Sequence, residues 1–305
     1  MADRKGSAAY TRKARPSRLS RSSIRDRDKT YPIPRLHGYV LSLSRIEDLL
    51  SLVSERPLSK RETLSGLNPD RADSIVAGAM VVRTIVEALG ADELTVSGKG
   101  LREGVAIEAL ADAMPVPGEV RASSVAALAA RFATWDAARA ERRRDLALEL
   151  YEATDDGKSG DAAEMVAHAA FILDAGAALD TYNRNEHAAA AVLSSDLCGF
   201  SHPQLAFIAA ILRRSDKPSA GIKPFRSLLR EYDPAVVTRS ATALAVADGV
   251  DRRLPEGASA VIRAGKHSIS AVGPLRGGRW SESLSSRTKT TMGRVFAVKT
   301  REDEP

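Results

Sequence analysis

The sequence predicts an α/β segment, then a mostly helical domain, then a small β-containing tail. Between residues 31 and 112, a helix, a turn, a short strand at 93–97, a glycine-bearing turn and another helix follow one another, which is typical of an α/β fold. From 113 to 254 the chain is a succession of alanine-rich segments with helical spacing and no convincing strand. Over 255–305, polar and apolar residues alternate around glycines, which favours strands.

Local signals place the elements of the α/β segment. A helix is expected at 44–54, where apolar residues recur at helical spacing behind a serine. A second helix begins near Asn68, which can cap it, and Pro69, which suits a first helical position, and it continues to Gly90. A third helix is expected at 101–114.

The segment PVPG at 115–118 interrupts this pattern and predicts the domain boundary. Helices of the following domain are expected at 123–135, 137–153, 161–180, 184–195, 203–215, 222–231 and 235–251. Strands of the tail are expected at 259–263, 267–272 and 294–299.

The positive charge of the chain is concentrated at its start. The formal net charge is +6, but residues 1–30 alone carry ten Lys or Arg against three Asp, which gives +7 and leaves −1 for all the rest. This arm lacks hydrophobic periodicity, so we expect it to be disordered. It either attracts a polyanion weakly, through the release of counterions, or is a solvated leader with no partner.

Composition excludes several classes of protein. The single cysteine, Cys198, excludes an intrachain disulfide and a thiolate zinc cage. No stretch approaches eighteen consecutive apolar residues, and residues 1–30 lack the apolar centre of a secretory signal. We therefore expect no membrane insertion and a cytoplasmic location.

Four sequence pieces in the α/β segment carry a family resemblance. They are GLNPDRAD at 66–73, a glycine at position 78 of the next helix, ELTVS at 93–97 and GLREG at 100–104. In this order they resemble the closing part of the catalytic half of the exopolyphosphatase and guanosine pentaphosphate phosphohydrolase (Ppx/GppA phosphatase) family. The resemblance implies that residues 31–112 are part of an actin-like, sugar-kinase-like lobe, and that the chain is the carboxy-terminal portion of a longer enzyme.

The resemblance places Arg71 and the turn containing Ser97, Gly98 and Gly100 at a phosphate-binding cleft. An arginine beside a helix start and a turn rich in backbone N–H groups both suit an anion. The alternative is that Arg71 pairs with a neighbouring aspartate and that the glycines only shape a tight turn.

Gly78 lies inside the second predicted helix, where a glycine costs about 1 kcal/mol relative to alanine. We therefore expect the backbone of a neighbour, or a ligand, to approach this helix closely at Gly78.

Two catalytic parts of the family are missing from this sequence. The family has an amino-terminal lobe with a glycine-rich loop that cradles phosphate, and a catalytic glutamate that orients the attacking water, and neither is present here. Phosphoryl transfer depends almost wholly on positioned charges. We therefore predict that this chain alone is inactive.

The helical domain resembles the HD-type domain that follows in this family, in a degenerate form. Residues 169–176 read AAFILDAG where an intact site reads AAxxHDxG, so Leu173 stands at the histidine position and Asp174 at the aspartate position. Asp248 matches the late aspartate, and Arg139 stands where the first histidine would be. Two carboxylates alone rarely hold a catalytic transition metal, so we expect no metal at this site.

Other candidate groups favour structural roles. His168 and His187 lie nineteen residues apart on predicted helices and are candidates for substitute ligands, although a histidine beside a packing face is usually structural. Cys198 lies in a turn, SDLCGF, that resembles a family turn with proline at this position, so a structural role is favoured over a thiolate.

Two functions follow from these observations. By resemblance the chain belongs to a hydrolase that removes terminal phosphate from polyphosphate or guanosine pentaphosphate, with Mg²⁺ as the family's cofactor. The alternative is a non-catalytic module that binds a polyanion or forms a homodimer.

Overall fold

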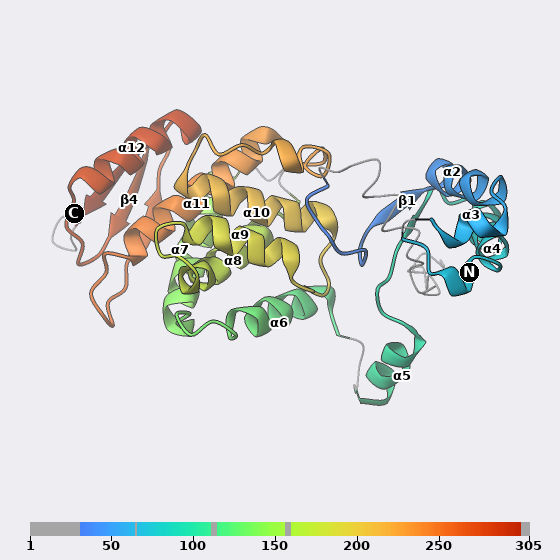
Figure 1. Cartoon of the computed structure of the whole chain (residues 1–305). Helices are drawn as coiled ribbons and strands as arrows, with labels where there is room; N and C mark the ends of the chain where they lie inside the picture. The colour runs from blue at the N-terminus through green and yellow to red at the C-terminus, as the bar shows by residue number, and fades with distance from the viewer. Residues whose placement is uncertain (1–30, 65, 111–114, 156–159, 300–305) are drawn as a thin grey trace, which may run out of the picture. The chain divides into compact units, whose positions relative to one another are not determined.

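The computed structural model is mostly helical and contains two small sheets (Figure 1). The chain divides into two compact units, residues 1–115 and 116–305. Within the described ranges, no helix is long and apolar enough to cross a bilayer. The structure describes residues 31–64, 66–110, 115–155 and 160–299.

The first unit pairs a short ribbon of two strands with a helical hairpin. β1 runs antiparallel to β2, with Leu41 opposite Leu94. Helix α2 packs along α4, and α3 lies against the short 3-10 helix η1. The elements are β1 (Val40–Ser42), α2 (Leu43–Ser54), α3 (Leu58–Glu62), η1 (Pro69–Arg71), α4 (Ile75–Ala88), β2 (Glu93–Thr95) and α5 (Leu101–Leu110).

Two separate apolar clusters hold this unit together. One gathers Ile46 of α2, Val86 of α4 and Val96, which follows β2. The other gathers Val53 and Ala72 around the opposite end of α2. The helix that the sequence predicts from Pro69 to Gly90 is shorter in the structure. A 3-10 turn, η1, comes first, and α4 begins only at Ile75.

The helical part of the second unit surrounds α10, whose residues from Leu205 to Leu212 are all buried. Its N-terminus has a capping box, in which Ser201 and Gln204 bond reciprocally to each other's backbone. The elements are α6 (Pro117–Ala129), α7 (Ala137–Thr154), α8 (Ala162–Ile172), η2 (Leu173–Ala178), α9 (Arg184–Ser194), α10 (His202–Asp216), η3 (Lys223–Phe225) and α11 (Pro234–Asp251).

Three of the helices expected from the sequence differ here. The helix expected at 123–135 begins and ends six residues earlier, as α6. The helix expected at 161–180 ends at Ile172 and continues as the 3-10 helix η2. The helix expected at 222–231 is wrong, because only η3 forms there and turns follow it. Phe225 and Leu229 are buried, and their anchoring outweighs local helix propensity.

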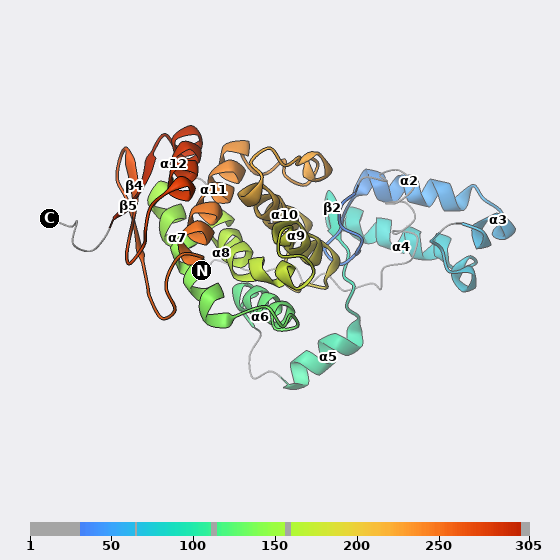
Figure 2. The ribbon, with the colours of Figure 1, turned by 60° about the vertical axis from the view of Figure 1, so that its left-hand side comes forward.

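The C-terminal part of this unit is a three-stranded sheet with a helix. β4 is central, antiparallel to β3 and parallel to β5. α12 packs on β5 and α11, and Figure 2 shows it beside the sheet. This helix is absent from the sequence-based expectations, because its residues are mostly Ser, Thr and charged. The elements are β3 (Val261–Ala264), β4 (Ser268–Val272), α12 (Arg279–Met292) and β5 (Val295–Lys299).

Arg287 of α12 ties this part to the helices. Its guanidinium donates to the carbonyl oxygens of Arg214 and Ser215 at the end of α10, at 2.7 and 2.6 Å, and to that of Ala241 in α11 at 3.2 Å. These C-terminal carbonyls of α10 lack partners within their own helix, so a buried cation is a suitable donor there.

Candidate functional site

The turn at residues 97–100 has its backbone N–H groups already engaged. Gly98 N–H donates to Nδ1 of His37 at 3.1 Å, Lys99 N–H to Oγ of Ser97 at 3.2 Å, and Gly100 N–H to Oε2 of Glu103 at 2.7 Å. A Cβ at Gly98 would lie 3.0 Å from the Cβ of His37, which accounts for glycine there. An anion at this turn would have to displace these side-chain acceptors.

Arg71 lies at the other end of α4 from this turn. It precedes α4 and is exposed, whereas Ser97 follows β2, beyond the C-terminal end of the helix. Figure 2 shows α3, which contacts η1, and β2 at opposite ends of α4. With a rise of about 1.5 Å per residue, α4 separates the two by roughly 20 Å. The structure does not bring these predicted phosphate contacts together.

Arg139, Asp174 and Asp248, the polar residues that the resemblance places at a degenerate metal site, lie in a cluster of buried charges in the second unit. Arg143 of α7 is fully buried, and its Nη1 donates to Oδ2 of Asp174 at 2.6 Å. Arg184, the first residue of α9, donates from one nitrogen to the other oxygen of Asp174 and from its second nitrogen to Asp248. One guanidinium thus bridges the two carboxylates that the resemblance assigns to a metal.

A third carboxylate extends this charge cluster on the side of α11. Asp251 is fully buried and accepts from Nε of Arg139 at 2.8 Å and from Nε of Arg142 at 2.9 Å. Arg139 also lies 3.5 Å from Asp174. The charge cluster therefore joins Arg139, Arg142, Arg143 and Arg184 to Asp174, Asp248 and Asp251, four cations and three anions.

Electrostatics keep Asp174 ionised. Its burial disfavours the charged form, but the positive charges of Arg143, Arg184 and Arg139 outweigh this cost, so the pKa of Asp174 lies below its ordinary value. An ionised carboxylate held by two guanidiniums is a strong, charge-assisted contact.

Gly176 allows α9 to come close enough for Arg184 to reach Asp174. A Cβ at position 176 would overlap the backbone carbonyl oxygen of Arg184. Only a glycine fits at this contact between η2 and α9. Leu173, which stands at the histidine position, is fully buried beside Asp174 in the chain.

The charge cluster includes residues that the sequence analysis missed: Arg142, Arg143, Arg184 and Asp251. A signal for Arg143 exists in the periodicity of α7, since Arg143 takes a buried position in step with Ala140, Leu146, Ala147 and Leu150. An arginine at such a position predicts a buried ionic partner. Arg184 has no comparable local signal.

The described residues do not fit Mg²⁺ or a transition metal at this charge cluster. Hard cations need several oxygen ligands, whereas Asp174 and Asp248 are held by arginine nitrogens. Among the described residues, no group of three or more His, Cys, Asp or Glu side chains is arranged to hold a metal ion.

His168 and Cys198 make structural contacts. His168 lies 3.4 Å from Glu164, which Arg121 binds through two nitrogens at 2.7 and 2.8 Å, and its ring packs edge-on against Phe200. Burial lowers the pKa of His168 below its ordinary value, so the ring is neutral near pH 7. The backbone N–H of Cys198 donates to Ser124 at 2.8 Å.

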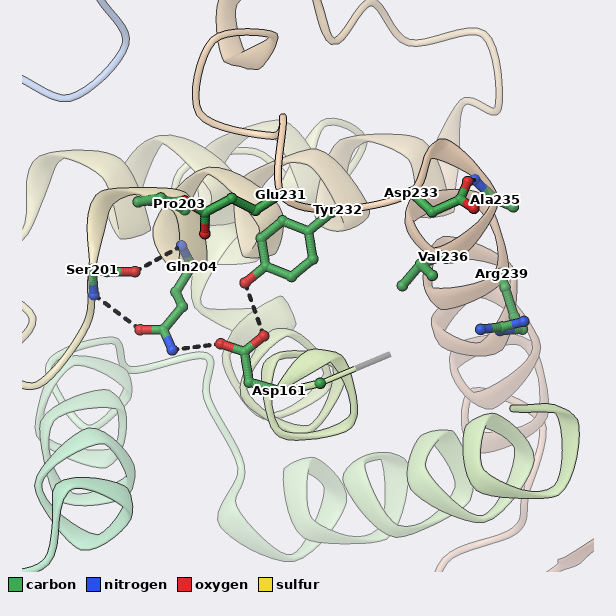
Figure 3. A pocket seen from close by; sticks show the side chains of 11 residues that line it. Asp161, Ser201, Pro203, Gln204, Glu231, Tyr232, Asp233, Ala235, Val236 and Arg239 are labelled. Carbon is green, nitrogen blue, oxygen red and sulfur yellow. Dashed lines mark hydrogen bonds between the residues drawn. The ribbon is translucent and has the colours of Figure 1, made fainter. Parts of the chain in front are cut away.

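A cavity of about 510 Å³ lies near the N-termini of α10 and α11 (Figure 3). Asp161 organises one wall by accepting from the Tyr232 hydroxyl at 2.9 Å and from Nε2 of Gln204 at 2.5 Å. Burial and the charge of Asp161 raise the pKa of Tyr232, which keeps the hydroxyl protonated. The lining carries three carboxylates, those of Asp161, Glu231 and Asp233, against the guanidinium of Arg239. This charge balance is unfavourable for polyphosphate.

Comparisons with known proteins define the class to which this two-unit fold belongs. A model described as the Ppx/GppA phosphatase family matches residues 18–113, and one described as Ppx/GppA phosphatase, domain III, matches residues 120–253. The chain belongs to the Ppx/GppA phosphatase family.

One curated relative shares part of this sequence. Guanosine-5'-triphosphate,3'-diphosphate pyrophosphatase of Photobacterium profundum is 26% identical over 184 residues, which cover 60% of this chain and 34% of the relative. The chain therefore spans about a third of the length of the relative it matches.

Proposed function

We propose that this chain acts as the carboxy-terminal portion of a phosphoanhydride hydrolase and supplies no catalytic metal site of its own. The substrate class, terminal phosphoanhydrides of polyphosphate or of guanosine pentaphosphate, is carried over from the family. The observation that carries the proposal is the bridging of Asp174 and Asp248 by Arg184, with Arg143 on the same carboxylate.

Replacing these arginines by a metal ion is unfavourable. A metal at Asp174 and Asp248 would have to displace Arg184 and leave Arg143, which is fully buried, beside a second cation. An uncompensated buried charge costs several kcal/mol. The charge cluster therefore supports a structural function for the helical domain, in which guanidiniums hold together helices that a metal would otherwise link.

The first unit supports a partial phosphate site at most. Arg71 is exposed and the N–H groups at Gly98 and Gly100 are engaged, about one helix length away from it. A single preorganised donor is worth about 2.7–4 kcal/mol in a transition state, far less than a phosphate-cradling loop with a positioned water. We propose that Arg71 and this turn contribute to substrate binding only when the catalytic lobe is present.

The release of phosphate tests this function. With polyphosphate and Mg²⁺, we expect no release by the chain alone above the uncatalysed rate. We expect release when the amino-terminal portion of the Photobacterium relative is joined to the chain, and a reduced rate after Arg71→Ala. Robust release by the chain alone, abolished by Arg71→Ala, would contradict the proposal.

Metal content tests the part played by the charge cluster. We expect elemental analysis of the purified chain to find no stoichiometric zinc, manganese or iron, since both imidazole positions are replaced. One tightly held equivalent that disappears on Asp174→Ala or Asp248→Ala would show that the arginines do not exclude a metal.

The second candidate function is a non-catalytic module that binds a polyanion, and the charge of residues 1–30 favours it. These residues lie outside the described part of the structure, and their +7 exceeds the net charge of the whole chain. Deleting them should flatten the salt dependence of polyphosphate or nucleic-acid binding. Unchanged affinity and unchanged salt dependence would place the binding surface elsewhere.

A further inference from the structure

The small sheet of the second unit has two edges with different surroundings. Its strand order is β3-β4-β5, so β3 and β5 each have one side that no other strand of this sheet covers. At the β3 edge, the N–H of Ile262 donates to Oε2 of Glu149 in α7 at 3.0 Å. A carboxylate of the same unit therefore occupies a backbone donor of this edge, which blocks pairing with a further strand.

The β5 edge has no such blocking group within the described residues. Val295, the first residue of β5, donates its N–H to the carbonyl oxygen of His267 and is thus bonded toward β4. Alternate residues of a strand direct their backbone groups to the same side of it. The backbone groups of Phe296 and Val298 therefore point away from β4, and in the part of the chain that the structure describes they have no hydrogen-bond partner.

The sequence of β5 leaves this edge open to pairing. It reads VFAVK, which has a high strand propensity and contains no proline. Its register with β4 runs without a bulge from Val295 to Lys299. Phe296 faces inward and is 3% exposed, whereas Val295 is 48% exposed on the outer face. A straight, apolar edge strand of this kind is a template for pairing with another chain.

We propose that β5 pairs antiparallel with β5 of a second copy of this chain, across a two-fold axis at Ala297, so that the two three-stranded sheets become continuous. In this register Ala297 stands opposite Ala297 of the second copy, and Phe296 stands opposite Val298. Phe296 and Val298 direct their backbone groups outward, so each such pair exchanges two hydrogen bonds. The pairing satisfies all outward backbone groups of these residues at once.

A second copy of β5 fits this edge better than the other described strands do. β1 and β2 have three residues each, and Glu149 occupies the β3 edge. A two-fold pairing is also closed, because it uses both β5 edges and leaves only β3 edges at the ends of the joined sheet. Pairing of β5 with β3 of another copy would instead propagate into an open filament. Glu149 thus permits a dimer and prevents longer assembly.

The side chains of β5 match this register. On the inner face, Phe296 meets Val298 of the second copy, so apolar side chains continue the buried layer of each sheet. On the outer face, Val295 meets Lys299 of the second copy. The two lysines are separated along the strand pair by roughly 13 Å, which exceeds the screening length of about 8 Å at physiological salt. Repulsion between like charges therefore does not oppose the pairing.

Helix α12 supplies complementary charges at the same level of the unit. It packs on β5, and only Gly293 and Arg294 separate the two elements, so α12 runs back along the strand (Figure 2). Glu282 and Lys289 are exposed, lie two turns apart on one helix face, and form no ion pair among the described residues. Their midpoint lies roughly 10 Å from the end of α12, and Ala297 lies roughly 10 Å from Arg294. A two-fold axis at Ala297 therefore sets Glu282 of one helix level with Lys289 of the other.

Disulfide formation tests the register in the full chain carrying Cys198→Ser. Ala297→Cys should form an interchain disulfide under mild oxidation, because Cα atoms of a directly opposed, non-hydrogen-bonded pair lie about 4.5 Å apart, within reach of a disulfide. Val295→Cys is the matched control on the same exposed face. Position 295 lies roughly 13 Å from its own copy across the axis, so this variant should not cross-link.

Sedimentation equilibrium tests the dimer and its contacts. We expect the dissociation constant to rise by about tenfold or more in Val298→Pro, because proline removes an outward N–H and no bond to β4. Ala264→Pro, at an outward position of β3, is the control and should leave the dimer unchanged. Lys289→Glu should weaken the dimer, and Glu282→Lys in the same chain should restore it.

Two results would overturn the proposal. One is the mass of a single chain at every concentration up to the high micromolar range, which would show that β5 is covered in another way or stays unpaired. The other is a dimer that does not cross-link through position 297, or that cross-links equally well through position 295, because a different surface would then join the copies. Neither result depends on phosphate release, so the hydrolase function is tested separately.

Discussion

The two units of this chain differ in what surrounds the glycines of their helical segments. Gly176 and Gly249 in the second unit are required by immediate neighbours, the Arg184 carbonyl and Leu284. Gly78 and Gly104 in the first unit face open space in the described structure. A glycine in a helical segment therefore marks close packing in the second unit, whereas in the first unit no described residue lies close to it.

Charge shows the same contrast between the units. Four arginines of the second unit are paired with buried aspartates: Arg139, Arg142 and Arg143 of α7 and Arg184 of α9. These charges are therefore compensated within the unit. Arg71 in the first unit is exposed, and within the described residues it forms no ion pair with Asp70 or Asp73. A charge that its own unit leaves unused is available for a ligand, which is why Arg71 remains our candidate phosphate contact.

Removal of a buried arginine should give the largest effect. Arg143→Met leaves Asp174 with less compensation in a buried position, and we expect a loss of about 3–5 kcal/mol in the free energy of unfolding. Arg71→Ala, in the open unit, should change it by less than about 0.5 kcal/mol. Urea unfolding of both variants measures the difference in the free energy of unfolding. Equal losses would contradict the conclusion that buried arginines stabilise the second unit more than Arg71 stabilises the first.

A matched pair of glycine substitutions should act with opposite signs. Gly176→Ala forces a Cβ into the Arg184 carbonyl and should cost about 1–3 kcal/mol. Gly78→Ala meets nothing within 4 Å in the described chain and should stabilise α4 by about 0.5–1 kcal/mol. Thermal unfolding of the two units distinguishes these results. Destabilisation by Gly78→Ala would mean that α4 is already covered in the free chain.

Acid should weaken the second unit selectively. Because the folded pKa of Asp174 lies below its ordinary value of 3.8, the unfolded chain binds more protons at low pH. The stability that Asp174 contributes is fully present only well above its ordinary pKa of 3.8, and it is lost as the pH falls through the lower folded pKa. Urea titrations at pH 5 and pH 3 should show this slope in the chain and a smaller one in Asp174→Asn.

The smallest effect should come from the wall of the cavity in Figure 3. Tyr232→Phe removes the 2.9 Å hydrogen bond to Asp161, which keeps its bond from Gln204, so we expect a loss of about 1 kcal/mol. Tyr182→Phe, on a side chain that is 93% exposed, is the control and should be neutral. Differential scanning calorimetry resolves the two, and a neutral Tyr232→Phe would show that Asp161 does not depend on this donor.

Sequence periodicity located the elements that bury an apolar stripe. Helices α7, α10 and α11 and the three strands of the tail lie within a few residues of their expected bounds. Helix α12 was not predicted, because its stabilisation comes from tertiary contacts, above all those of Arg287, and not from an apolar face. The helix expected at 222–231 failed for the converse reason, since two buried side chains anchor turns there.

The candidate site was predictable only in part. The resemblance singled out Asp174 and Asp248, and the structure links both to Arg184. Arg184 itself could not be found from local pattern, because its role depends on the close approach of α9 to Gly176, a tertiary contact. Arg71 and the turn at 97–100 belong to sequence pieces that occur in the order typical of the family, but they lie at opposite ends of α4. The order of the pieces along the chain did not indicate how far apart these residues lie in the structure.

Hydrogen exchange tests the central contrast most directly. In the chain alone, we expect amides of α7, α10 and α11 to exchange only through global unfolding, and those of α4 and α5 to exchange many times faster through local opening. If α4 and α5 are already protected as strongly as α10 in the chain alone, the first unit is complete by itself and the account is wrong.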